Sequence, residues 1–317
     1  MNGEGTKASP YEVTTVAEFY EAVADHKSEC PYVKLMNDID FNDYDYWNLK
    51  KTEISFTEFD GQNHVIKNIF FKDIDKLFYI STSYNISKTL KNTIFEVIKF
   101  DSINSSCFID FMSFSVENFI VNCEFRAKMF SYKPSAYPLI KVGNNWRILN
   151  CVFNIDYYDG GYANNGIIQV NPNNSLTPYM DNCEVNINLY IHKNATNNFV
   201  IRILNGGNNS YAGYFRNIAL FINTYCSSST TCRPVYIFDG KCKASNISVV
   251  LQNKGKLDLD RFYFLLSSGD YLEGINIYDK DVLGTTKQST SNSNLMALTT
   301  EQMKDPEYLN SIGFPII

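Results

Sequence analysis

The sequence contains few residues of the types from which most catalytic and metal sites are built. It has 3 histidines in 317 residues, and they are too scattered to form one site. It has no Gly-rich phosphate loop, no nucleophile elbow and no metalloprotease helix. Lys and Arg form no stripe and the net charge is −6, so nucleic acid is not an expected partner. We therefore expect no cofactor and no bound metal.

Long apolar runs are also missing. A helix that spans a bilayer needs about 20 mainly apolar residues, and no run in the sequence approaches this length. The first seven residues show no basic region followed by an apolar stretch, so the sequence predicts no secretory signal. We expect no membrane partner and expect the chain to be made in a cytoplasm.

What the sequence does contain is a short repeat, in which an Asn or Gly is followed by alternating apolar residues. The repeat recurs about once every 30 residues. Its copies begin at Asn68, Asn122, Asn150, Asn182, Asn217, Asn246 and Gly274. The first and third residues after the Asn or Gly are apolar, whereas the second and fourth are mixed. Successive side chains of a strand point to opposite faces, so each repeat has one interior and one lateral face.

Repeats of this length cannot bury an apolar face alone, so each copy must stack on its neighbours. We therefore predict an all-β parallel solenoid whose asparagines form a hydrogen-bonded ladder at one corner. In the last copy Ile275 and Ile277 are expected inside, and Asn276 and Tyr278 outside. The alternative is a β-sandwich with a turn signal every 8–12 residues. Hairpin dipeptides of the Asn-Gly type occur at Asn165-Gly166 and Asn205-Gly206, but these do not lie between matched strands.

A further strand of each coil is expected between the repeats. The candidate segments are Ile94–Phe100, Cys107–Phe114, Pro138–Val142, Gly166–Val170, Phe199–Leu204, Val235–Phe238 and Arg261–Leu266. Several of them are apolar on both faces, which suggests lateral packing against another chain. The 22 Tyr and 23 Phe are too many for the interior alone, so many rings must lie on lateral faces. Exposed Tyr is typical of protein interfaces and of sugar-binding surfaces.

The opening of the chain resembles a known family. The matching residues are Leu35, Asn37, Asp38, Ile39 and Asp40, then Phe59, Asp60, Gly61, His64, Ile66, Asn68 and Ile69. They resemble the first coils of right-handed parallel β-helix proteins of the pectate-lyase-like and phage spike or fibre type. The resemblance covers about the first third of the chain and implies a single-stranded right-handed β-helix. It says little about function, because this fold carries many functions.

The domain division follows from the repeat and its flanks. We expect a flexible N-terminal arm at 1–12, a capping helix within 13–31, the parallel β-helix at 32–282, and a loop with a C-terminal cap at 283–317. The capping helix is predicted from Val16 to about Asp25, after Thr14-Thr15. A C-terminal helix is predicted to open at Thr299 and to end at Gly313-Phe314-Pro315.

Six of the eight cysteines fall into two groups. Cys123, Cys151 and Cys183 occupy the same interior slot in three repeats, where small thiols are easily buried. Cys226, Cys232 and Cys242 form a second group, for which a metal site or a disulfide is the alternative. No flanking histidines complete a zinc set, so structural thiols are the favoured interpretation.

Three weak candidate sites follow from outward-facing acidic residues. Glu124 and Glu184 share one outward slot two coils apart, about 10 Å at ~4.8 Å per coil, which is marginal for an inverting glycosidase pair. Asp156, Tyr157, Tyr158, Asp159 and Tyr162 are predicted to form a loop that binds sugar or calcium. Asp38, Asp40, Asp43 and Asp45 form a third acidic group, for which corner roles are favoured over calcium.

The sequence therefore predicts a structural protein of a phage virion: a β-helix fibre or spike, located in the virion, that attaches to a host surface. Expected partners are other virion proteins, two further copies in a trimer, and host surface polysaccharide. A trimer could bury lateral aromatic faces around a closed three-fold axis. The alternative is a polysaccharide lyase or glycoside hydrolase, such as a phage depolymerase, acting on a lateral face with Glu124 and Glu184.

Overall fold

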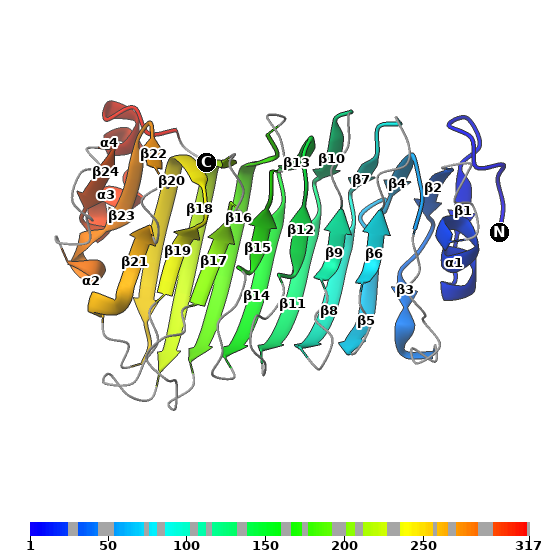
Figure 1. Cartoon of the computed structure of the whole chain (residues 1–317), viewed down its shortest axis with the longest axis horizontal. Helices are drawn as coiled ribbons and strands as arrows, with labels where there is room; N and C mark the ends of the chain where they lie inside the picture. Colours follow the sequence, from blue (N-terminus) through cyan, green and yellow to red (C-terminus); the bar gives the residue numbers. More distant parts are fainter. Residues whose placement is uncertain are drawn as a thin grey trace.

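The computed structural model describes most of the chain in sixteen segments. They are residues 1–24, 31–43, 54–72, 76–80, 86–101, 107–111, 116–131, 138–159, 166–172, 177–191, 201–206, 212–226, 235–255, 259–265, 271–284 and 294–315. The fold is an all-β parallel solenoid whose coils follow one another along the long axis of the molecule (Figure 1). All pairings between its named strands are parallel, which excludes the β-sandwich.

The strands form two sheets. The larger sheet contains β1 (Tyr11–Val13), β2 (Tyr32–Leu35), β3 (Ile39–Asp40), β4 (Glu58–Asp60), β5 (Val65–Lys72), β7 (Thr89–Lys91), β8 (Ile94–Asp101), β10 (Asn118–Val121), β11 (Glu124–Ser131), β13 (Trp146–Leu149), β14 (Val152–Asp159), β16 (Tyr179–Ile191), β18 (Gly213–Cys226), β20 (Cys242–Asn253), β22 (Tyr271–Glu273), β23 (Asn276–Asp279) and β24 (Leu295–Leu298). The smaller sheet contains β6 (Lys76–Ile80), β9 (Cys107–Phe111), β12 (Ile140–Val142), β15 (Ile168–Val170), β17 (Ile201–Asn205), β19 (Val235–Asp239) and β21 (Phe262–Leu265).

Each coil turns a corner within the larger sheet and then crosses to the smaller one. In one coil, β10 leads to Asn122 at the corner, β11 follows, and β12 returns through the smaller sheet to β13. The corner asparagines have positive φ angles between 50° and 56°. Asn adopts this left-handed conformation more readily than other side chains.

The corner amides form the predicted ladder. The Nδ2 of each Asn donates to the side chain of the preceding coil: Asn92 to Asp60 (3.0 Å), Asn122 to Asn92 (3.3 Å), Asn150 to Asn122 (3.3 Å) and Asn182 to Asn150 (2.8 Å). Asn217 donates instead to Asp181 (2.8 Å), and Asn246 continues to Asn217 (3.0 Å). Each run therefore ends on a carboxylate at its N-terminal side, because a carboxylate only accepts hydrogen bonds.

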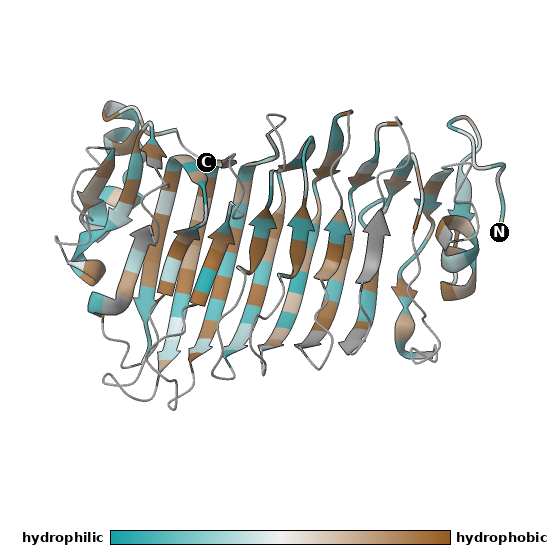
Figure 2. Ribbon diagram, viewed as in Figure 1, coloured by the Kyte–Doolittle hydropathy of each residue, from teal (hydrophilic) through white to brown (hydrophobic). Residues whose placement is uncertain are grey.

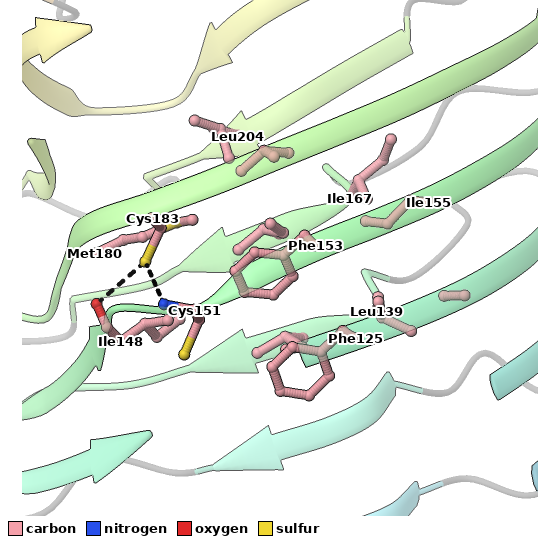
Figure 3. Close-up of a cluster of buried hydrophobic side chains, with 14 of the residues drawn as sticks. Phe125, Leu139, Ile148, Cys151, Phe153, Ile155, Ile167, Met180, Cys183 and Leu204 are labelled. Atoms are coloured by element: carbon pink, nitrogen blue, oxygen red, sulfur yellow. Dashed lines mark hydrogen bonds between the residues drawn. The ribbon is translucent and has the colours of Figure 1, made fainter. Parts of the chain in front are cut away.

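Apolar side chains fill the interior in columns that follow the coils, and apolar and polar residues alternate along the strands (Figure 2). Phe95, Phe125 and Phe153 stack with ring centroids 5.3 and 5.0 Å apart. Beside them, the Cys183 Sγ donates to the Ile148 carbonyl and accepts from the Cys151 N–H (Figure 3). Phe125, Phe153, Cys151 and Cys183 lie at inward positions that the alternation in the sequence predicts.

The sequence pattern assigned the corner of the first repeat to the wrong residue. Asn68 has a positive φ angle of 57°, but it lies inside β5, where the register with β8 shifts between Ile66 and Ile69. Its Nδ2 donates to Asp40 Oδ1 at 2.7 Å. Asn92, which the sequence analysis passed over, occupies the ladder instead, and Ile94–Phe100 therefore belongs to β8 of the larger sheet rather than to a returning strand.

The last repeat is shifted by one residue. Ile277 pairs with Ser248 and Tyr278 with Val249, so Tyr278 faces the interior and is fully buried. Asn276 is buried as well and accepts a hydrogen bond from the Ile247 N–H at 3.1 Å. One extra residue, Ile275, follows the corner and reverses the predicted faces.

The expectation that the returning strands are apolar on an outer face is also wrong. Consecutive pairs of apolar residues in them are fully buried within this chain: Phe108 and Ile109, Leu139 and Ile140, Ile167 and Ile168, Ile203 and Leu204, Ile237 and Phe238. The N–H groups of Phe108 and Ile109 both donate to the Leu139 carbonyl, at 2.9 and 3.1 Å. The backbone turns there, so successive side chains both enter the core instead of alternating.

Helices lie at both ends of the solenoid (Figure 1). α1 (Val16–Ala24) begins after Thr15, as predicted, and its Phe19 packs edge-on against Phe41 and Phe59 of the first coils. Before it, Tyr11 and Glu12 pair with β2 in the sheet, although residues 1–12 were expected to form an arm.

The C-terminal end contains α2 (Lys280–Leu283), α3 (Thr300–Lys304) and α4 (Pro306–Ser311), with short 3-10 turns at Phe41–Asp43 and Leu259–Arg261 elsewhere. Thr299 caps α3 in a capping box with Gln302. Asp305 then caps α4, whose first residue is Pro306, so two short helices replace the single one predicted. The predicted loop after Leu283 lies mostly outside the described residues.

Candidate functional site

The outward side of β8, β11, β14, β16, β18 and β20 is the surface on which polar side chains gather. We call it the lateral face. Because the register is continuous, its side chains form columns across the coils. One column contains Glu96, Arg126, Asn154, Asn186, Phe221 and Val250, and the next contains Ile98, Lys128, Asp156, Asn188, Asn223 and Gln252.

A groove of about 440 Å³ lies along these two columns. Its lining includes Glu96, Arg126, Lys128 and Asp156, two residues of each charge, together with Asn154, Asn186 and Asn188. Asn68, from the irregular part of β5, lines it as well. The lining also includes Val97, Ile98, Ala127 and Ile155, so the groove combines apolar and polar surface, and the charges on its lining balance.

Amide ladders run along both columns of the groove. Asn186 donates to Asn154 at 2.9 Å, and Asn154 donates to Glu124 at 2.9 Å. In the second column Asn223 donates to Asn188 at 2.9 Å, and Asn188 donates to Asp156 at 2.8 Å. These bonds hold the amide groups in fixed orientations.

The ladders leave hydrogen-bonding capacity unused. An amide nitrogen carries two N–H groups and an amide oxygen accepts two hydrogen bonds. Within the described part of the chain, Asn154, Asn188 and Asn223 each use one N–H in the ladder, whereas Asn186 uses both, the second on Glu184 at 2.7 Å. The groove therefore presents oriented donors and acceptors at the coil spacing of ~4.8 Å.

Arg126 holds the acidic end of the first column. Its Nε and one terminal nitrogen donate to the two oxygens of Glu124 at 2.7 and 3.1 Å, and the other terminal nitrogen donates to Glu96 at 2.9 Å. Arg126 lowers the pKa of the Glu124 carboxyl below its ordinary value, and this outweighs the effect of burial. Glu124 is therefore a carboxylate near neutral pH and has no proton to give as a general acid.

Glu124 and Glu184 occupy one outward column two coils apart, as the sequence predicts, because Val152 pairs with both. Both carboxylates are engaged in side-chain hydrogen bonds, Glu124 with Arg126 and Glu184 with Asn186. The structure places no third carboxylate between them in that column. A catalytic role for the pair stays a prediction.

The predicted loop from Asp156 onward is largely a strand. Residues 156–159 end β14, so their side chains alternate: Tyr157 and Asp159 are buried, whereas Asp156 and Tyr158 face outward. These four side chains cannot line one site, because strand geometry directs them to opposite faces. Tyr162 lies outside the described residues.

An aromatic ladder borders the groove beyond Lys128 and Asp156. Phe130, Tyr158, Tyr190 and Tyr225 stack with centroids 4.6, 4.5 and 4.7 Å apart and nearly parallel planes. Lys254 lies over Tyr225 at 5.7 Å. The stacked rings cover one another's faces, so these tyrosines offer ring edges and hydroxyls rather than flat surfaces to a ligand.

In the third acidic group, the Asp38 and Asp40 side chains accept hydrogen bonds within the chain. Asp38 accepts from the Val65 N–H at 2.9 Å, and Asp40 accepts from Asn68 and from the Asn42 N–H. The side chains of Asp43 and Asp45 are not described. Across the described residues, no three His, Cys, Asp or Glu side chains come together as a metal site, and no helix there is long and apolar enough to cross a bilayer.

Sequence reasoning missed most of the groove. Asn154, Asn186, Asn188 and Asn223 were assigned to the outside or passed over, and their common columns were not recognised. The signal was present: Asn recurs four and six residues after the corner Asn in neighbouring repeats. These asparagines can be assigned to common columns only when the register between neighbouring strands is known.

Cys123, Cys151 and Cys183 are buried free thiols, as predicted, and so are Cys107 and Cys242. Cys226 is disulfide-bonded. The alternative of a disulfide therefore holds for Cys226, while Cys242 takes no part in one.

Comparisons with known proteins assign no family and no activity to the chain. No protein family model and no curated protein sequence matches the chain. A crystal structure of a candidate immunoglobulin A1 protease from Bacteroides ovatus is similar over 98% of this chain and 89% of its own, with 15% identity and a TM-score of 0.48.

Proposed function

We propose that this protein is a non-catalytic attachment protein that binds an extended polysaccharide along its lateral face. The observation that carries the proposal is the groove with its two amide ladders. Sugars are recognised through many hydroxyl groups, each of which needs an oriented donor or acceptor, and the groove supplies them at regular intervals.

Charge and fixed geometry support binding over catalysis. The lining carries two carboxylates and two cations, so it imposes no strong field on a ligand. Glu124 is held as a carboxylate by Arg126, so Glu124 is not the proton donor that a glycosidase pair requires. Oriented but chemically unreactive groups are what a binding surface needs.

The location in a phage virion, the contact with other virion proteins and the trimer stay predictions from the sequence. Attachment to a host surface is the part of that prediction that the groove supports, because surface glycans are long, hydroxyl-rich chains. We retain the virion fibre or spike as the proposed setting.

Affinity electrophoresis tests the proposal. The chain is run in native gels that contain a mixed-linkage β-glucan, a galactomannan, polygalacturonate or hyaluronate. We expect at least one polymer to retard the protein, and Asn188→Ala to weaken the retardation. Gln169→Ala, on β15 of the smaller sheet, is the matched control and should migrate as the unaltered chain does. The absence of retardation in all four gels, or equal loss in both variants, contradicts the proposal.

A further inference from the structure

Among the described residues, one aromatic side chain on the lateral face differs from the rings of the aromatic ladder. Phe221 of β18 is 42% exposed. Among the described residues, no other ring stacks on it, whereas the rings of the aromatic ladder cover one another. Phe221 therefore keeps apolar ring surface open to solvent.

Its position continues the groove. Phe221 pairs in register with Asn186, and Asn223, two residues further on, pairs with Asn188. Asn186 and Asn188 line the groove, so Phe221 lies one coil beyond its end, about 4.8 Å along the axis. A chain bound in the groove would reach this ring without bending away from the face.

The side chains next to Phe221 along its column and along its strand carry no charge. Asn186 and Val250 are its neighbours along the column, and Ala219 and Asn223 are its neighbours along the strand on the same face. The carboxylate nearest in register is Glu184, which pairs with Ala219 and would repel an anionic group. An apolar surface flanked by amides suits an uncharged ring that has both C–H groups and hydroxyls.

From this arrangement we infer that Phe221 is the stacking platform for one neutral pyranose ring of the bound glycan, and that Asn186 and Asn223 bind the hydroxyls at its edge. The inference rests on the proposed function, because it names the sugar class for the same face. It assigns the glycan as neutral at this position: a hexose or an N-acetylated hexosamine rather than a uronic acid.

Two variants of Phe221 test the assignment with the four polymers named above. Phe221→Ala should weaken binding to a neutral polymer about tenfold, the effect of losing an interface anchor. Tyr263→Ala, a ring 38% exposed on β21 of the smaller sheet, is the aromatic control and should leave binding unchanged. Both changes are at exposed positions, and circular dichroism checks that the fold is kept.

Phe221→Trp adds a readout that does not depend on affinity. The unaltered chain contains two tryptophans, Trp47 and Trp146, so a change in emission that appears only in the variant reports on position 221. We expect its emission to shift to shorter wavelength when galactomannan or β-glucan oligosaccharides bind.

The outcomes separate the inference from the proposed function. Retardation by neutral polymers that persists in Phe221→Ala, or retardation by the acidic polymers alone, overturns the role of Phe221 and leaves polysaccharide binding intact. If the emission wavelength of Phe221→Trp does not shift while the polymer still retards this variant, the role of Phe221 is likewise overturned and polysaccharide binding is kept. No retardation by any polymer overturns both.

Discussion

At the scale of the residue, the corner asparagines carry two separate tasks. Each adopts a positive φ angle, which costs most other residues ~1–2 kcal/mol. Each also donates one hydrogen bond to the coil before it, as Asn150 does to Asn122. Substitution can separate the two contributions.

Asn150→Ala removes both the residue that adopts the positive φ angle readily and the hydrogen bond to Asn122. We therefore expect the free energy of unfolding to fall by about 1–3 kcal/mol. Asn150→Gly keeps the backbone conformation and removes only the amide, so it should cost less. Urea denaturation followed by circular dichroism measures both. Equal losses in the two variants would show that the backbone conformation contributes nothing.

The ion pair of Glu124 with Arg126 predicts a pH dependence. The folded-state pKa of Glu124 lies below its ordinary value of 4.5, so its contribution to stability is present above that value and is lost as pH falls through the folded pKa. The difference in unfolding free energy between the unaltered chain and Glu124→Gln should be largest near neutral pH and shrink in acid. A difference that stays constant from pH 7 to pH 3 contradicts this.

Single residues were predictable where one repeat resembles another. The corner role of Asn122, Asn150, Asn182 and Asn246 follows from the local pattern alone. Asn68 was taken for a corner because the apolar Ile69 follows it directly, whereas Thr93 follows Asn92, and only pairing with the next coil reveals the irregular register in β5.

At the scale of the element, the strands are held by columns of side chains that extend through several coils. Phe153 is fully buried and stacks on Phe125 at 5.0 Å. We expect Phe153→Ala to lower the free energy of unfolding by about 3–5 kcal/mol, because it leaves a cavity between coils. Tyr158→Ala, in the half-exposed ladder of the same strand, should cost clearly less. Thermal denaturation of both variants gives the comparison, and equal costs would contradict it.

The thiol column gives a second prediction at this scale. Burial raises the pKa of the Cys151 and Cys183 thiols well above the ordinary value, so neither is a thiolate in the folded protein. Iodoacetamide at pH 8 should leave the peptides that contain them unmodified, and should modify them in urea. Peptide mass spectrometry measures the extent of labelling. Rapid modification of Cys151 in the native protein would show that the coils open locally.

Elements were predictable where alternation is strict. The strands after the corner and the start of α1 were predicted correctly, because apolar periodicity and a Thr cap specify them. The returning strands were misread, because a turned backbone sends two neighbouring apolar side chains inward and removes the alternation on which the prediction depends.

At the scale of the whole molecule, the fold class followed from the repeat, whereas the groove did not. A groove on a solenoid is made of residues about 30 positions apart, and its contents depend on the register of several coils at once. The apolar pairs of the returning strands are buried within the chain and do not form an outer apolar face, which removes one argument for the trimer. The described residues expose four large apolar side chains, namely Met36, Ile86, Phe221 and Tyr263.

Light scattering tests the trimer and the absence of catalysis in one experiment. The protein is mixed with purified host capsule, and both are followed on one column. A mass near three times 36.3 kDa with capsule of unchanged length agrees with a trimeric attachment protein. A mass of 36.3 kDa contradicts the trimer, and shortened capsule returns Glu124 and Glu184 to a catalytic role.

The direction of the amide ladders has a consequence for how the molecule could change length. Every described ladder bond runs from one coil to the coil before it, and each run of bonds ends on a carboxylate. A duplicated segment that begins and ends at equivalent asparagines would carry its own donor amide, and the coil before it would provide an acceptor oxygen. The coils are therefore structurally interchangeable. Duplicating one of them, in evolution or by design, would lengthen the lateral face and, under the proposed function, the stretch of glycan that it binds.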